Sequence, residues 1–238
     1  MSIALTEITL TKGRHQTPFD GMNLIEACAY IAGESFTDHP KCVSRLLAET
    51  GRQLNDLLPA DERQNLKPLI PYLIRTIGDG FDLERPGLAW SWVVGVYVPT
   101  WLRLAGLENH AATLEIANPD DALPPLIAAR EAIENATWDV SWDVAWEAAW
   151  SAARSAARNA ARSAARNTAW GAAHSASRNA AWHTAWSVAW DVAEGAVWYA
   201  AAHSTASALQ LTSDALRASF TQVYFAMVML GQETEPTL

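Results

Sequence analysis

The sequence has few cysteines and none of the long apolar runs that membrane-spanning helices require. Only Cys28 and Cys42 occur in 238 residues, too few for the disulfide framework of many small secreted domains. The first residues also lack the basic start and apolar core of a secretory signal. The longest uncharged stretch of the second half, 195–213, is rich in Ala, Ser, Thr, His and Gln. We therefore expect a cytoplasmic protein with reduced thiols and no membrane contact.

Helix-breaking residues are scarce in the second half of the chain. Proline is absent from Leu126 to Leu230, and glycine occurs only at Gly171 and Gly195 between residues 138 and 205. Because proline and glycine are the strongest helix breakers, their scarcity predicts long helices there. Half of the residues are hydrophobic, enough for a buried core. We predict an all-α fold, a helical bundle or array with a C-terminal Ala/Trp/Arg tetrapeptide-repeat region.

Basic residues and known catalytic motifs are also lacking. The chain has 17 Lys and Arg against 26 Asp and Glu, a net charge of −9. Nucleic-acid binding is driven by basic side chains that neutralise phosphates, so a nucleic-acid partner is not expected. The sequence contains no P-loop, no dinucleotide-binding fingerprint, no nucleophile elbow and no His-Glu-x-x-His pattern. Nothing nominates a reaction, and we expect a non-enzymatic protein without a cofactor.

Prolines divide the chain. The apolar segment 88–104 predicts helix that Pro99 kinks or splits. Residues 118–125 contain three prolines and two acids, which cannot continue a helix but suit the start of the next. We therefore expect an N-terminal helical region over 1–118 and a repeat helical region over 119–238, packed together.

A four-residue repeat runs from Trp138 to Thr205. Its first position holds Trp, Arg, His or Glu, and its third and fourth are almost always Ala, with Val, Ser or Thr as substitutes. Each tetrad advances about 400° around a helix of about 3.6 residues per turn, so the first-position column moves about 40° per step. A single isolated helix could not bury tryptophans that point in every direction.

The glycines of the repeat are the natural places for helix breaks. We expect helices over roughly 126–169, 172–193 and 196–230. Paired alanines would let helix backbones approach closely, while each tryptophan supplies the large apolar area that alanine lacks.

An arginine column occupies the middle of the repeat. Its members lie four residues apart, where like charges destabilise an isolated helix by a few tenths of a kcal/mol, roughly, per pair. One explanation is pairing with acidic residues such as Asp120 and Glu131, or stacking on tryptophans. The other is a surface for an anionic ligand or an acidic protein partner. The candidate binding residues are Arg154, Arg158, Arg162, Arg166, Arg178, Trp150, Trp170 and His174.

One cluster in the first half has residue types suited to catalysis or metal binding. His39 and Cys42 could share one face of a helix, and Cys28 could join them at a metal or as a nucleophile pair. Zinc sites normally need four ligands, however, and the apolar surroundings of Cys28 favour a buried, inert thiol. Asp38 before His39 is typical of a helix cap. We expect no metal, and retain His39 and Cys42 as the candidates for an enzyme or metal site.

Several segments resemble a family of uncharacterised bacterial and bacteriophage proteins. The resemblance is carried by Met22-Asn-Leu-Ile-Glu-Ala, Asp38-His-Pro-Lys-Cys42, Asn55-Asp56, the segment 66–74 and the segment 98–107. Family members follow a similar N-terminal region with Ala-rich Trp/Arg tetrads. The resemblance spans most of the chain, its Asp-His-Pro-x-Cys motif is fairly specific, and it implies no activity. A looser likeness in composition is to immunity proteins that neutralise bacterial toxins.

Three functional hypotheses follow. The first is a helical module that binds a protein partner, in phage–host or toxin–immunity conflict, since Trp and Arg dominate interface energetics. The second is a protein that binds or sequesters an anionic small molecule or nucleotide through the Arg/Trp column. The third is an enzyme or metal site at His39 and Cys42. Homo-oligomers are compatible with all three.

Overall fold

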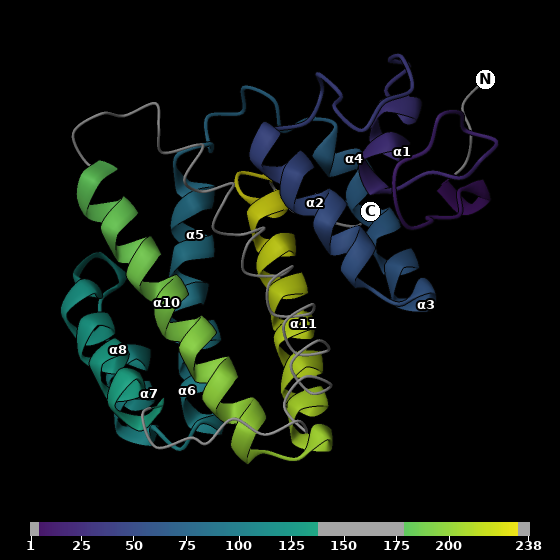
Figure 1. Cartoon of the computed structure of the whole chain (residues 1–238). Helices are drawn as coiled ribbons and strands as arrows, with labels where there is room; N and C mark the ends of the chain where they lie inside the picture. Colours follow the sequence, from purple (N-terminus) through teal and green to yellow (C-terminus); the bar gives the residue numbers. More distant parts are fainter. Residues whose placement is uncertain (1–4, 138–178, 233–238) are drawn as a thin grey trace, which may run out of the picture. The chain divides into compact units, whose positions relative to one another are not determined.

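The computed structural model describes residues 5–137 and 179–232 (Figure 1). Every element in these two ranges is helical, and no strand occurs in them. The predicted all-α class is confirmed. The chain divides into two compact units, residues 1–88 with 221–238 and residues 89–220. The helices of the described ranges include none that is both long and apolar enough to cross a bilayer.

The first unit is built around a short, largely buried helix, α1 (Leu24–Ile31), which contacts α2 (Arg45–Leu57) and α4 (Ile70–Leu73). Leu24, Ile25 and Cys28 on α1 are completely buried. The remaining elements of this unit are η1 (Leu5–Glu7), α3 (Ala60–Arg63) and η2 (Gln64–Leu69). Burial of Cys28 agrees with its apolar sequence surroundings.

The end of α11 (Ala206–Met229) is anchored in this first unit by two buried polar side chains. Tyr224 donates through its hydroxyl to the carbonyl of Leu47 at 3.0 Å. The buried Arg85 donates from Nε to the carbonyl of Met227 at 3.0 Å and pairs with the carboxylate of Asp79. A buried guanidinium needs such partners, because an unpaired buried charge is strongly destabilising.

The second unit begins within a helix that contains a π-helical turn. α5 (Glu84–Trp92) leads into a π-helical turn, η3 (Val93–Tyr97), and then into α6 (Val98–Leu104). Pro99 lies in the first turn of α6, where the missing N–H of proline does least harm. The segment 88–104 is thus helical throughout, with a π-helical turn directly before α6, and a kink or split at Pro99 stays a prediction.

In its described residues the second unit also contains α7 (Glu108–Glu115), η4 (Pro119–Asp121), α8 (Leu123–Thr137), α10 (Asn179–His203) and the first part of α11. α10 packs against both α8 and α6, and Figure 1 shows α8 alongside α10. The first-position Trp186 is buried against Trp90, with ring centroids 4.7 Å apart.

The part of the repeat within α10 buries its small residues. From Val188 to Ala201, every third and fourth position of the tetrads is buried, all of them Ala or Val. The first position changes along the helix, because Trp186 is buried whereas Trp190 and Trp198 are half-exposed. The small positions, in contrast, stay buried along this whole stretch, in a helix that contacts both α8 and α6. The rotation of about 40° per tetrad stays a prediction.

The expected helix break at Gly195 is wrong. α10 continues through Gly195 to His203, and the next helix begins only at Ala206. A Cβ atom at residue 195 would lie 2.6 Å from Cγ2 of Ile133 on α8. The glycine therefore permits close approach of two helices and does not end one. The helices expected over 172–193 and 196–230 are corrected accordingly, while Gly171 lies outside the described residues.

The compact units do not follow the division at residue 118. Trp90 Nε1 donates to the carbonyl of Pro119 at 2.8 Å, and α7 contacts α8 across the proline-rich segment. Residues on both sides of position 118 thus belong to the same unit. The split into regions 1–118 and 119–238, as a statement about folding domains, stays a prediction.

We predict that Gly195→Ala destabilises the protein by about 1–3 kcal/mol, because the added methyl group overpacks against Ile133. Gly87→Ala is the matched control: it also lies within a helix, and a Cβ atom there meets nothing within 4 Å. The control should change stability by at most about 1 kcal/mol, in the stabilising direction. Chemical denaturation measures both effects. A Gly195→Ala variant as stable as the control would contradict this packing role. So would a Gly195→Ala substitution that destabilises the Ile133→Ala variant as much as it destabilises the unsubstituted protein.

Candidate functional site

The sequence-predicted Arg/Trp column lies outside the described residues. This applies to Trp150, Trp170, His174 and all five arginines of the candidate set, Arg154, Arg158, Arg162, Arg166 and Arg178. Its role in ligand or partner binding stays a prediction. The candidate site lies in the first unit.

The structure gives His39 and Cys42 different surroundings. His39 is 68% exposed, with Nε2 3.7 Å from Oδ1 of Asp38. Burial, together with the hydrogen bond and the negative charge of Glu34, raises the pKa of Cys42 to about 11. Burial also raises the pKa of Cys28 well above its ordinary value. Because the thiolate is the reactive and metal-binding form, both cysteines are poorly suited to either role near neutral pH.

The histidines, cysteines and acids of the described ranges form no group of three or more that could hold a metal ion. A site at His39 and Cys42 therefore gains no support from geometry, and it stays a hypothesis.

The most elaborate polar arrangement of the first unit surrounds the fully buried carboxylate of Glu26. Its Oε1 accepts a hydrogen bond from the backbone N–H of His15 at 2.7 Å. Its Oε2 lies 2.8 Å from Nδ1 of His15 and accepts the backbone N–H of Asn23 at 2.8 Å. Since a carboxylate only accepts hydrogen bonds, the proton of this pair lies on Nδ1. Glu26 thereby fixes both the backbone and the ring of His15.

The same glutamate is part of the start of α1. Asn23 is the N-cap, and its side chain accepts from the backbone N–H groups of Ile25 and Glu26. The Glu26 carboxylate in turn accepts a hydrogen bond from the backbone N–H of Asn23, which completes a capping box. The loop before α1 is therefore attached to the helix by the cap and by His15 together.

The network continues from His15 to Thr11, whose Oγ1 lies 3.0 Å from His15 Nε2. Carboxylate, imidazole and hydroxyl follow one another as in serine hydrolases. The hydroxyl is covered, however: Gly21 has φ +113°, and a Cβ atom there would lie 2.5 Å from Thr11 Oγ1. Thr11 also lies within 3.3 Å of the carbonyl of Met22. Through these contacts the Thr11 side chain cross-links the loop, and its hydroxyl points into the loop.

A tight turn at the tip of this loop exposes an aromatic ring. Asp20 N donates to the carbonyl of Thr17 at 3.1 Å, and the Asp20 carboxylate accepts from the backbone and the hydroxyl of Thr17. Pro18 occupies the second position of the turn, where its fixed φ is favourable. Phe19, at the third position, is 99% exposed. The ring is thus presented to solvent by an ordered backbone.

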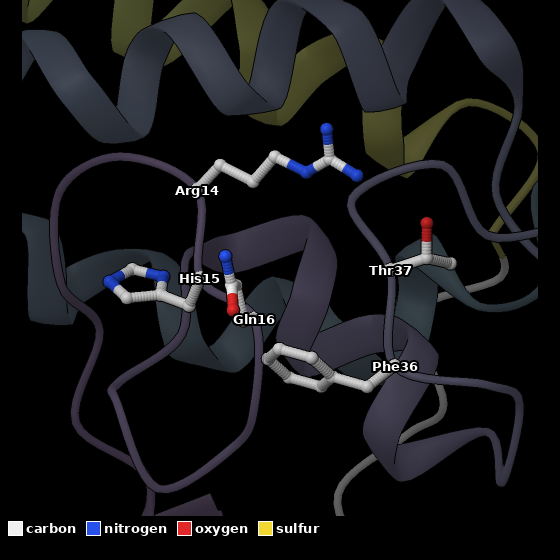
Figure 2. A pocket seen from close by; sticks show the side chains of 5 residues that line it. All are labelled: Arg14, His15, Gln16, Phe36 and Thr37. Atoms are coloured by element: carbon white, nitrogen blue, oxygen red, sulfur yellow. The ribbon is translucent and has the colours of Figure 1, made fainter.

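A surface pocket of about 470 Å³ lies between the same loop and the segment after α1. Arg14, His15 and Gln16 line one side, and Phe36 and Thr37 line the other. Figure 2 shows the Phe36 ring directed toward the loop that carries Gln16, and Arg14 extended along the opposite edge. The lining combines one guanidinium, one aromatic ring and several hydrogen-bonding groups.

Both walls of the pocket are held by side chains that bond to the backbone. On one wall, Gly13 N donates to Asp56 at 2.8 Å and its carbonyl accepts from Asn23 at 3.0 Å. On the other, Lys41 N donates to Glu34 at 2.7 Å, and Arg52 donates to the carbonyl of Asp38. Because the walls are already fixed, less conformational entropy is lost when a partner binds.

Asp38 lies behind Arg14 and is nearly buried. Its Oδ1 is 3.4 Å from Nε of Arg14, but within the described ranges this oxygen has no hydrogen-bond partner. Such buried acceptors are uncommon and call for an explanation. The sequence motif Asp-His-Pro had indicated a helix cap for Asp38; the structure instead places Ser44 as the residue before α2.

Comparisons with known protein families, with curated proteins and with solved structures found no match to this chain. The resemblance to bacterial and bacteriophage proteins is not tested by them and stays an expectation. The function must therefore be argued from the residues themselves.

We predict that Cys42 reacts slowly with iodoacetamide at pH 8 and that Glu34→Gln accelerates the reaction. Removing the negative charge stabilises the thiolate and lowers the pKa of Cys42 from about 11. Peptide mass spectrometry resolves Cys42 from Cys28. Glu108→Gln, in the second unit, is the control and should leave the rate unchanged. Fast alkylation of Cys42 in the unsubstituted protein would show that its thiol is activated and would revive the third hypothesis.

Proposed function

We propose that this chain is a binding module that recognises a protein partner, and that Phe19 is a principal contact. The observation that carries the proposal is the 99% exposure of this aromatic ring on a turn fixed by hydrogen bonds. Large apolar side chains at the centres of interfaces contribute most of the binding free energy. Burying a phenylalanine side chain is worth about 1.5–3 kcal/mol.

The arrangement around the turn supports this role. The loop that carries Phe19 is attached to α1 through His15 and Glu26, so little backbone ordering is required on binding. The pocket lined by Arg14 and Phe36 begins three residues before the turn. Aromatic and arginine side chains are both enriched at interfaces.

The half-exposed tryptophans of the repeat are compatible with the same function. Trp190 and Trp198 are only partly covered within the second unit. A phage–host or toxin–immunity setting is part of the proposal and rests on the resemblance and composition of the sequence.

A photo-crosslinking phenylalanine analogue at position 19 tests the proposal in bacterial cells that express the protein. Ile116, which is 86% exposed in the second unit, provides the matched control position. We expect one discrete crosslinked protein from position 19 that is absent from position 116. With that partner purified, Phe19→Ala should weaken binding by about 10- to 100-fold, measured by calorimetry.

Two results would contradict the proposal. One is a pattern of crosslinks from position 19 that matches that from position 116. The other is an identified partner that binds Phe19→Ala as tightly as the unsubstituted protein.

A further inference from the structure

We propose that the pocket between residues 14–16 and 36–37 binds a small molecule that combines an anionic group and a planar ring. This inference does not depend on the protein-partner proposal, because Phe19 does not line the pocket. The pocket volume of about 470 Å³ lies within the range of about 300–1,000 Å³ that is typical of small-molecule sites.

Arg14 is the residue that would bind the anionic group. Its side chain is 73% exposed, yet Asp38 holds it from behind through Nε. The contact engages Nε, and the terminal nitrogens of a guanidinium are well placed to bind two oxygens of a carboxylate or phosphate. Asp38 thus acts as a positioning residue for Arg14.

Phe36 supplies the reason for the planar ring. Its side chain forms the wall opposite Gln16 (Figure 2). An aromatic face at a pocket edge stacks on planar rings, and such stacking contributes about 1–3 kcal/mol per base in nucleic-acid complexes. The amide of Gln16 and the hydroxyl of Thr37 can form hydrogen bonds with polar atoms at the edge of such a ring.

Two classes of molecule share this chemistry. Purine mononucleotides carry a phosphate and a planar base, whereas aromatic amino acids carry a carboxylate and an aromatic ring. Titration calorimetry of the full chain with AMP and with phenylalanine distinguishes them. Adenosine, which lacks the anion, and inorganic phosphate, which lacks the ring, complete the set of probes.

We expect AMP or phenylalanine to bind with a Kd below about 1 mM. Arg14→Gln should weaken that binding by at least about 10-fold, and Phe36→Leu by a similar factor. Arg103→Gln is the matched control, since Arg103 is also a partly exposed arginine paired with one carboxylate, that of Glu115. It should bind the probes as the unsubstituted protein does.

The inference is overturned if neither AMP nor phenylalanine binds, or if Arg14→Gln binds them unchanged. It is also overturned if adenosine or inorganic phosphate binds as tightly as the probe that carries both the anionic group and the ring. None of these results bears on crosslinking at position 19, so failure of this inference and failure of the protein-partner proposal are separate outcomes.

Discussion

The candidate site depends on one buried carboxylate. Glu26 has no solvent contact, so its charge is tolerated only with several hydrogen-bond donors around it. Three donors come from two places in the preceding loop, the backbone and ring of His15 and the backbone of Asn23. The need to satisfy this carboxylate therefore determines the path of residues 11–23.

That path explains how the features of the loop arise together. His15 is held by Glu26 on one side and Thr11 on the other, which places Arg14 and Gln16 at the pocket. The chain then has to return to Asn23 within a few residues. It does so through the turn at Pro18 and through Gly21, whose positive φ and contact with Thr11 leave no space for a side chain. Phe19 is consequently exposed at the tip, because the turn that carries it faces solvent.

The sequence predicts the helical class well because its strongest signal is local. Absence of proline and richness in alanine predict helix on both sides of residue 195, and α10 and α11 are helical there. The helix break predicted at Gly195 is wrong because glycine can either end a helix or permit close contact between two helices. Only the position of Ile133 in the folded protein decides between these roles. Within α10 the small positions of the tetrads and Trp186 are buried, and the ring of Trp186 packs on Trp90. The large-beside-small packing expected of the tetrads stays a prediction.

The site was harder to predict because its residues come together only in the tertiary structure. The pattern Asn23-x-x-Glu26 does signal a capping box, but nothing in the sequence indicates that Glu26 also binds His15. Phe19 was equally hidden, since aromatic residues are usually buried and exposure cannot be read from residue type. Asp38 was assigned to a helix cap because Asp before proline commonly has that role, whereas here it supports Arg14.

Amide hydrogen exchange at His15 and Asn23 is the most direct test of the role given to Glu26. Both amides donate to this carboxylate, and the account predicts that they are protected in the unsubstituted protein. Glu26→Ala should abolish that protection while the amides of α2 and α10 remain protected. Exchange at His15 and Asn23 that is already as fast as in an unstructured peptide, or protection that survives the substitution, would contradict the account.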